Sequence, residues 1–183
     1  VTRAHLADGV ARAAICNSGN ANACTPDGYA NAEKTCAALA AELGIKGDDI
    51  IVASTGVIGV SLPVDQLVSG IPALVSDLGD TAADSDRAAR AIMTTDTKKK
   101  EFSYSMTLGG KTARIGGICK GSGMISPNMA TMLCFITTDA AISSVMLQKA
   151  LSSVIKDTFN MVSVDGDTST NDMVTVLASG LAG

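Results

Sequence analysis

A glycine-rich segment followed by a threonine carries the residue types best suited to chemistry. Residues 116–130 contain four glycines, Lys120 and Pro127, and Thr131 opens the hydrophobic run that follows. Glycine adopts backbone conformations closed to other residues, so such a segment can hold a strained peptide bond or bring N–H groups to a ligand. A threonine hydroxyl at the start of a strand is a candidate nucleophile, activated by a neighbouring base or by its own freed amine. The alternative interpretation is a glycine-rich hairpin that leads into a core strand.

Two other polar segments follow expected strands, where site residues often lie. Residues 17–23 (NSGNANA) combine asparagine and glycine, which favour turns and bond to nearby backbone. Thr55 and Gly56 end a buried strand, where a hydroxyl and a backbone N–H can point at the same spot, as an oxyanion hole requires. A self-bonded surface loop explains the first segment equally well, and an ordinary strand end explains the second.

Residues 93–97 (MTTDT) and 165–172 (DGDTSTND) are further clusters of hydrogen-bonding side chains. The first connects an expected helix to an expected strand. The second holds three acidic residues but lacks the twelve-residue pattern, ending in glutamate, of a calcium-binding loop. With one histidine, His5, and no C-x-x-C pair, a zinc site is not expected either. No G-x-G-x-x-G or phosphate-binding loop joins a strand to a helix, so nucleotide binding is not supported.

The composition is that of one compact domain with a core of aliphatic residues. The 183 residues are 46% hydrophobic and 17% charged, and only 3% are aromatic. The net charge is -4, and the one basic run, residues 98–100, is predicted to be a solvated turn, so a nucleic-acid partner is not expected. No apolar run is long enough to cross a membrane. Five isolated cysteines suit a reducing compartment, and a chain that opens at Val1 without methionine is expected to be cut from a longer one.

Hydrophobic periodicity and turn residues predict helices and strands around these segments. Helices are expected at residues 29–43, 64–68, 71–78, 84–92 and 143–159, and strands at 11–16, 49–54, 102–108, 112–118, 131–138, 161–164 and 173–178. Gly44 and Gly70 are expected to end helices, Ser143 to cap one, and Gly109-Gly110 to form a hairpin turn. The mixture favours an α/β fold, a layered mixed β-sheet domain with flanking helices, over a purely parallel, doubly wound sheet.

Five segments together resemble the glutamate N-acetyltransferase, or ornithine acetyltransferase, family of bifunctional arginine biosynthesis enzymes. They are residues 17–23 (NSGNANA), 54–59 (STGVIG), 93–97 (MTTDT), 120–133 (KGSGMISPNMATML) and 164–172 (VDGDTSTND). The segments follow one another in the family's order along almost the whole chain, and jointly they are highly specific. The chain lacks the family's first segment and a large C-terminal portion, so residues 1–183 are expected to be a single-domain internal fragment.

The resemblance implies an autoprocessing enzyme with an N-terminal nucleophile. Cleavage of the Ala130–Thr131 bond would separate residues 1–130, part of the family's α-chain, from residues 131–183, the start of its β-chain. The Thr131 hydroxyl would attack the Ala130 carbonyl in an N-to-O acyl shift, and water would release the ester. The freed α-amine of Thr131, with an ordinary pKa near 8, could then act as the base for its own hydroxyl, which binds the substrate covalently.

The implied reaction is ping-pong acetyl transfer from N2-acetylornithine to glutamate through an acetyl-threonine intermediate. Thr55, through its hydroxyl, and Gly56, through its N–H, match the family's oxyanion hole. Lys120 and one of Thr94 or Thr95, with Thr94 preferred, match substrate-binding positions. The resemblance implies no metal and no cofactor, apart from acetyl-CoA as an alternative acetyl donor. It also implies a cytoplasmic location, small-molecule partners rather than nucleic acid or membrane, and a heteromultimer of the cleaved α- and β-chains.

Two alternatives to this reaction remain open. An amidase or aminopeptidase with an N-terminal nucleophile would reach the same acyl-enzyme and then pass the acyl group to water. A catalytically incomplete fragment would fold or assemble without turnover, because the family's acidic substrate ligand and its C-terminal polar ligands lie beyond Gly183.

Overall fold

The structure is a computed structural model that describes residues 1–126, 129–130 and 132–183. The predicted nucleophile, Thr131, lies outside the described residues. Of its neighbour Ala130 the backbone is described, in a short strand. The predicted division of the chain between these two residues therefore stays a prediction.

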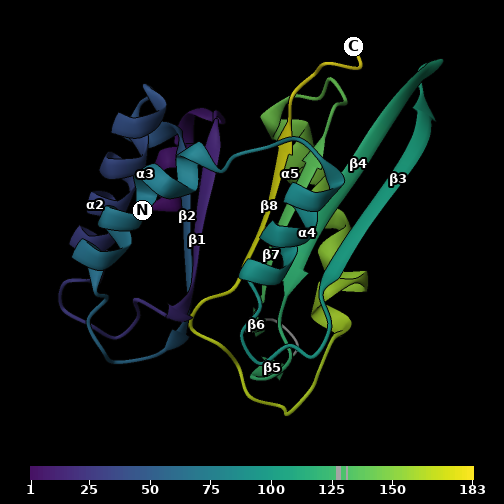
Figure 1. Ribbon diagram of the computed structural model, residues 1–183. Coiled ribbons are helices and arrows are strands. Elements are labelled where there is room, and N and C mark those ends of the chain that lie inside the picture. The colour runs from purple at the N-terminus through teal and green to yellow at the C-terminus, as the bar shows by residue number, and fades with distance from the viewer. Residues whose placement is uncertain (127–128, 131) are drawn as a thin grey trace. The chain divides into compact units, whose positions relative to one another are not determined.

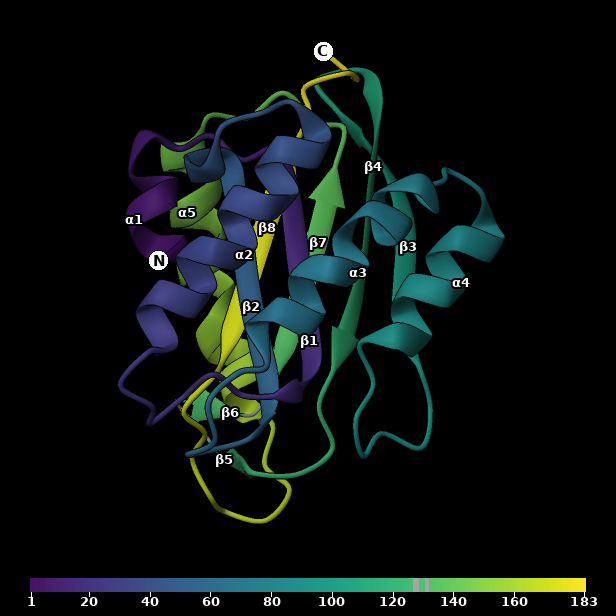
Figure 2. The ribbon, with the colours of Figure 1, turned by 60° about the vertical axis from the view of Figure 1, so that its left-hand side comes forward.

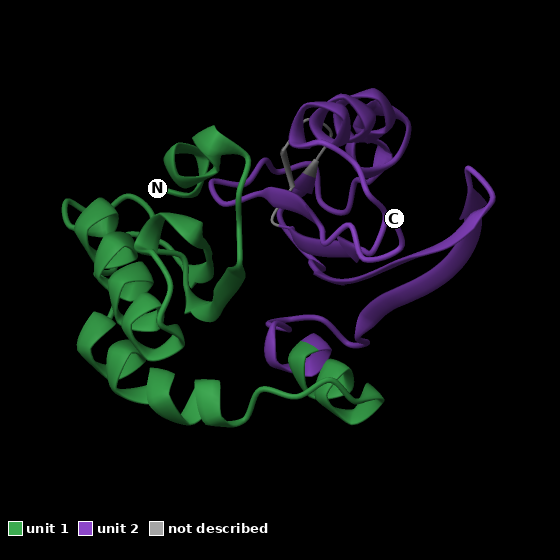
Figure 3. Cartoon of the chain, turned by 90° about the horizontal axis from the view of Figure 1, so that it is seen from above, with its two compact units in different colours: residues 1–88 green, residues 89–183 purple. Residues whose placement is uncertain are grey.

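The described chain forms two compact units, Val1–Ala88 and Ala89–Gly183 (Figure 3). The sequence suggested a single domain over residues 1–183. The boundary between the two units separates groups of residues that contact one another within the fold. It lies after Ala88, well before the predicted cleavage bond between Ala130 and Thr131. Each unit has its own sheet and helices.

The first unit is built on two parallel strands with helices on one face (Figures 1 and 2). Strand β1 (Ala13–Asn20) pairs along its whole length with β2 (Ile50–Val57). Helices α2 (Gly28–Leu43) and α3 (Val64–Ser76) lie side by side on the same face of this pair. The side chains enclosed between the helices and the strands form the core: Ile15, Cys36, Leu39, Ala40, Ile50 and Ile71. Short segments complete the unit, namely α1 (Thr2–His5) and the 3-10 turns Leu6–Asp8 and Gly47–Asp49.

Local sequence patterns predicted most of the first unit correctly. Helix α2 follows its expected range, and Gly44 ends it in the left-handed conformation at φ 65°. Strand β1 continues beyond its expected end at Cys16, because β2 keeps pairing with it as far as Asn20. Part of the NSGNANA segment, expected as a loop, is therefore strand.

Helix α3 corrects one prediction. The sequence predicted two helices separated at Gly70, but a single helix runs through Gly70 and Pro72 to Ser76. Proline removes one backbone donor and glycine costs conformational entropy, so both disfavour a helix interior. Ile71, which stands between Gly70 and Pro72 in the sequence, is only 1% exposed and belongs to the core. Most helix stability in proteins comes from packing an apolar face, and here that packing outweighs the local breaking signals.

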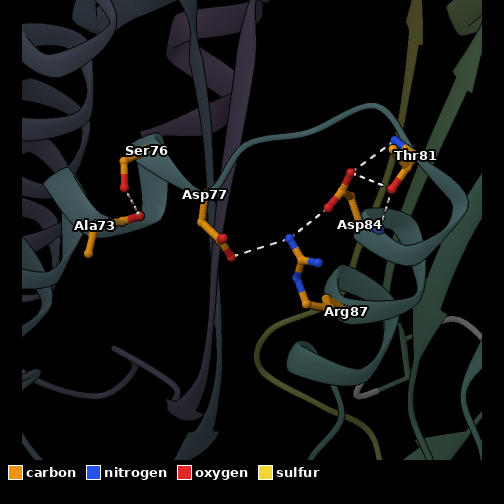
Figure 4. A network of polar contacts seen from close by, with 6 residues as sticks. All are labelled: Ala73, Ser76, Asp77, Thr81, Asp84 and Arg87. Atoms are coloured by element: carbon orange, nitrogen blue, oxygen red, sulfur yellow. Dashed lines mark hydrogen bonds and ion pairs between the residues drawn. The ribbon is translucent and has the colours of Figure 1, made fainter.

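A local polar network orders the connection after α3 (Figure 4). The carboxylate of Asp84 accepts hydrogen bonds from the backbone N–H of Thr81, at 2.9 Å, and from its hydroxyl, at 2.6 Å. Arg87 joins Asp84 to Asp77 by ion pairs. These contacts surround the start of α4 (Ala82–Ala91), which was expected at residue 84.

The second unit contains a four-stranded mixed sheet in the order β3-β4-β7-β8 (Figure 1). Its strands are β3 (Lys100–Leu108), β4 (Lys111–Lys120), β7 (Leu133–Thr138) and β8 (Met173–Ala178). Neighbours are antiparallel from β3 to β7, whereas β7 and β8 are parallel. The predicted hairpin and mixed sheet are confirmed. A small pair, β5 (Ile125–Ser126) with β6 (Met129–Ala130), follows β4.

The helical part of the second unit is shorter than predicted. Helix α5 (Ser144–Val154) begins with Ser143 as its cap, whose Oγ accepts from the N–H of Met146 at 3.3 Å. The helix then gives way to two 3-10 turns, Ile155–Asp157 and Phe159–Met161. The strand expected at residues 161–164 is wrong. Instead, the backbone N–H of Val164 donates a single bond to the carbonyl of Ile125, at 2.8 Å.

All five cysteines are free thiols, and two of them face each other across the second sheet. Cys119 of β4 is the register partner of Cys134 of β7. Across the part of the chain that the structure describes, no helix combines the length and the apolar character needed to cross a membrane.

Candidate functional site

Three consecutive residues after α4 contact three consecutive residues at the end of β4. The lysine ammonium donates to a threonine Oγ1 at 2.9 Å, a backbone N–H donates to an aspartate Oδ1 at 2.9 Å, and two hydroxyls lie 2.7 Å apart. The pairs are Thr94 with Lys120, Asp96 with Gly121, and Thr95 with Ser122. The structure thus brings together Thr94, Thr95 and Lys120, three of the four residues for which a substrate-binding role was predicted, whereas the fourth, Thr131, lies outside the described residues. We call this set of six residues the 94–122 cluster.

Lys120 is a deeply buried charged residue of the cluster. It is the last residue of β4 and is 2% exposed. A buried ammonium is costly unless it is hydrogen-bonded or paired, and the Thr94 hydroxyl supplies one acceptor. In surroundings of low dielectric constant, such a cation attracts a carboxylate or polarises a carbonyl more strongly than in water. Its position therefore suits recognition of a small anionic or carbonyl-bearing substrate.

Asp96 organises the cluster, and sequence reasoning missed it. The buried carboxylate accepts from the backbone N–H groups of Gly121 and of Thr94, the latter at 3.3 Å, and pairs with Lys100. Burial acts to raise the pKa of Asp96, but the bonds from Lys100, Gly121 and Thr94 outweigh it and hold that pKa below its usual range. The available signal was the spacing of four residues between Asp96 and Lys100. Lys100 belongs to the basic run 98–100, which was predicted to be a solvated turn. Lys100 instead begins β3 and pairs with Asp96.

The glycine-rich segment around the predicted cleavage bond is held by two carboxylates of the loop before β8. Asp165 accepts from the backbone N–H of Met124 at 2.5 Å and of Ile125 at 2.9 Å. Asp172 accepts from the backbone N–H of Met132 at 3.0 Å, through Oδ1. Met124 has a positive φ of 56°, a conformation that non-glycine residues rarely adopt, and the bond from its N–H to Asp165 helps to hold it. The carboxylates thus fix the backbone on both sides of Thr131.

The acidic loop is used for these backbone contacts rather than gathered around a metal. The bonds from Met124 and Ile125 lower the pKa of Asp165 below its usual range. Asp167 donates its own backbone N–H to Asp165 at 3.3 Å. Among the described residues, no group of three or more His, Cys, Asp or Glu side chains has an arrangement that could hold a metal ion.

The predicted oxyanion-hole residues belong to the first unit. Thr55 is fully buried on β2. Gly56 has a φ of 131°, and a Cβ placed on it would lie 2.3 Å from the carbonyl carbon and oxygen of Gly19 on β1. Only glycine fits there, since its backbone is left-handed and in close contact with the next strand. The catalytic role of Thr55 and Gly56 stays a prediction.

The asparagines of the NSGNANA segment bond to backbone within the first unit. The side-chain amide of Asn20 donates to the carbonyl of Val60 at 2.9 Å, and its oxygen accepts from the N–H of Asn22 at 2.7 Å. Asn17 donates to the carbonyl of Asn20 at 2.8 Å. The asparagine side chains thus bond to nearby backbone as expected, but Asn17 and Asn20 do so from strand β1 rather than from a surface loop.

Comparison with known proteins identifies relatives of the whole chain. The ArgJ family matches residues 1–183. The Arginine biosynthesis bifunctional protein ArgJ of Lactococcus lactis is 50% identical over 183 residues, which are 100% of this chain and 45% of that protein. Its namesake from Symbiobacterium thermophilum is 52% identical over 100% of this chain and 45% of that protein. The chain therefore spans less than half the length of these curated relatives.

Two solved structures share the fold. The crystal structure of Arginine biosynthesis bifunctional protein argJ from Bacillus halodurans has a TM-score of 0.63 and 39% identity, over 72% of this chain and 68% of that chain. Ornithine acetyltransferase from Mycobacterium tuberculosis, solved in complex with ornithine, has a TM-score of 0.59 and 35% identity, over 69% of this chain and 67% of that chain. With the family matched from the first residue to the last, this chain belongs to the ArgJ family.

Proposed function

We propose that this chain serves acetyl transfer from N2-acetylornithine to glutamate in arginine biosynthesis. The observation that carries the proposal is the 94–122 cluster, in which a buried lysine and a threonine lie 2.9 Å apart in a chain of the ArgJ family. The names of the curated relatives support the pathway, and the ornithine complex of the M. tuberculosis protein supports the substrate class.

The proposed nucleophile is made by self-cleavage. The Thr131 hydroxyl attacks the Ala130 carbonyl, the peptide C–N bond breaks, and the nitrogen takes the hydroxyl proton. Water then hydrolyses the resulting ester and leaves Thr131 with a free α-amine. The solved B. halodurans chain supports a divided precursor. The whole of this chain covers only 45% of the length of the L. lactis relative. In contrast, 72% of this chain is enough to cover 68% of the solved chain. The solved chain is therefore much shorter than the curated relative.

In the proposed transfer, Thr131 attacks the acetyl carbonyl of N2-acetylornithine and releases ornithine, and glutamate then takes the acetyl group. Lys120 binds an α-carboxylate or a polarised carbonyl, and Thr94 binds a polar group of the substrate. The bond between Lys120 and Thr94 supports Thr94 over Thr95, whose hydroxyl is engaged by Ser122. Thr55 and Gly56 stabilise the negative oxygen of each tetrahedral intermediate.

Intact mass of the full-length protein tests the cleavage step. Two pieces whose masses sum to the precursor plus one water, with Thr131 newly N-terminal, are expected. A cut at another bond would refute Thr131 as nucleophile.

Acetylornithine turnover with and without glutamate tests the acceptor. Ornithine release that depends on glutamate is expected. Equal release to water without glutamate would instead support the amidase alternative. Assaying the 183-residue chain beside the full-length protein addresses the other alternative, since measurable transfer by the shorter chain would exclude a catalytically incomplete fragment. Replacing acetylornithine with acetyl-CoA tests the second donor. The cytoplasmic location and the heteromultimer stay predictions.

A further inference from the structure

Two free thiols lie directly opposite each other in the sheet of the second unit. Cys119 of β4 and Cys134 of β7 are register partners in an antiparallel ladder, so their side chains lie on the same face. The Cβ atoms of such a pair are about 4.5–5.5 Å apart, and those of a disulfide are about 3.5–4.5 Å apart. A small approach of the two strands is therefore enough to join the two sulfurs.

A lysine flanks this pair on the neighbouring strand. Lys100 of β3 is the register partner of Cys119 on the side away from Cys134, so its cation lies on the face that carries the thiols. The pKa of Cys119 lies below its usual range, mainly because the Cys134 thiol bonds to its sulfur. The positive charges of Lys100 and Lys120 lower that pKa further, against the opposing effects of burial and Asp96. Cys119 is therefore the thiol of the pair that more readily becomes a nucleophilic thiolate.

Cys134 has the opposite properties. It is 1% exposed, whereas Cys119 is only half-buried. Its bond to Cys119 raises the pKa of Cys134, and so do burial and the negative charge of a Cys119 thiolate. A reagent from solution thus meets Cys119 first. The geometry provides one accessible attacking thiol and one sheltered thiol that can resolve a mixed disulfide.

The dithiol adjoins the 94–122 cluster. The Cys119 thiol donates to the backbone carbonyl of Lys120 at 3.8 Å. Leu133, the register partner of Lys120, directly precedes Cys134. A bond between the sulfurs removes the S–H that contacts Lys120 and draws together the backbone on both sides. The bond of Lys120 to Thr94, at 2.9 Å, lies at the end of the strand that this displaces.

We propose that Cys119 and Cys134 form a reversible disulfide, with a low-molecular-weight disulfide as the oxidant, and that the oxidised protein binds its substrate more weakly. The effect on binding rests on the proposed function, in which Lys120 and Thr94 contact the substrate. A dithiol that is reduced by default and oxidised on exposure to such a reagent is also the form in which disulfides occur in reducing compartments.

The exchange takes place in two steps. The Cys119 thiolate attacks one sulfur of the reagent and expels the other sulfur as a thiolate, which leaves a mixed disulfide on Cys119. The sulfur of Cys134 then attacks the Cys119 sulfur and expels the second thiolate. The two protons of the dithiol end on the two released thiols. The pair is oxidised by two electrons, and the reagent is reduced by two.

The test treats the reduced full-length protein with glutathione disulfide under native conditions, blocks the remaining thiols and maps the linked peptides by mass spectrometry. Peptides that contain Cys119 and Cys134 should become linked with loss of two hydrogens, and dithiothreitol should reverse the link. The link should be absent from Cys119→Ser and Cys134→Ala. It should persist in Cys24→Ser, which removes an exposed thiol of the first unit and is the matched control.

The same samples test the effect on binding. Loss of one hydrogen bond predicts that oxidation raises the KM for N2-acetylornithine about three- to tenfold. The rise should appear in the wild type and in Cys24→Ser, disappear with dithiothreitol, and be absent from Cys119→Ser.

Either of two mapping results would overturn the disulfide: no link between Cys119 and Cys134 in the folded wild type, or a glutathione adduct on Cys119 that Cys134 never displaces. This measurement needs no variant, so it decides even if Cys119→Ser does not fold. A linked protein with an unchanged KM, or an equal rise in Cys119→Ser, would overturn the effect on binding. If the reduced wild type transfers no acetyl groups, the proposed function fails, whereas the disulfide is still judged by the mapping.

Discussion

The ammonium of Lys120 lies 2.9 Å from the hydroxyl of Thr94, although 26 residues separate them along the chain. The two residues belong to different elements, because Lys120 is the last residue of β4 and Thr94 lies in the connection after α4. The bond therefore joins two parts of the second unit at the point where a substrate-binding role was predicted for both.

Replacing Lys120 by methionine should weaken substrate binding. The change keeps an unbranched side chain that is one atom shorter and removes the buried charge, and hydrogen bonds to charged groups contribute about 1.5–3 kcal/mol. The KM for N2-acetylornithine in the full-length protein is expected to rise about ten- to hundredfold. Lys156→Met, which removes an exposed lysine, is the control. An unchanged KM in Lys120→Met would contradict the assigned role.

Asp96→Asn should destabilise the protein in a pH-dependent way. The pKa of Asp96 is held below its usual range in the folded state, so its charge stabilises the fold above its unfolded pKa, near 4. That stabilisation is lost as the pH falls through the lower, folded pKa. Urea unfolding at pH 7 should give a loss of about 1–3 kcal/mol, and the difference from wild type should shrink below about pH 4. A difference that is the same at pH 7 and pH 3 would argue against this account.

Gly56→Ala should be far more damaging than Gly59→Ala. Both glycines have positive φ, 131° and 78°, so both substitutions strain the backbone. Only at Gly56 would the new Cβ also meet the backbone of Gly19, at 2.3 Å, whereas nothing lies within 4 Å at Gly59. Thermal unfolding should therefore show a much larger drop in Tm for Gly56→Ala. Similar drops for both variants would mean that the contact between β1 and β2 relaxes easily.

Thr131→Ala should abolish self-cleavage, and Thr131→Ser should slow it. Alanine removes the attacking oxygen, whereas serine keeps it but lacks the methyl group that restricts rotation of the side chain. Intact mass over a time course after purification measures both. Thr112→Ala, an exposed position in the β3–β4 hairpin, controls for the purification. Cleavage of Thr131→Ala at the wild-type rate would assign the nucleophile to another residue.

Local patterns identified most elements because their signals lie within a few residues of one another. The apolar spacing and final glycine of α2, the Gly109-Gly110 turn and the Ser143 cap are signals of this kind. The same reasoning failed at α3, where Gly70 and Pro72 are strong breaking signals and the opposing force is burial of Ile71 against distant residues. It also failed at residues 161–164, a short run that pairs with no strand in the part of the chain that the structure describes.

By itself, the sequence determined the family, the mixed α/β class and the residues with suitable chemistry, because motifs and periodicity are properties of neighbouring positions. Tertiary structure alone decided which of these residues meet. It placed residues 94–96 against 120–122, and it bonded Asp165 and Asp172 to backbone 41 and 40 residues away. Such contacts depend on how β4, β7 and β8 align in the sheet, and no short-range pattern records that alignment. The acidic loop thus changed from a weak metal candidate into the support of the segment that contains Thr131.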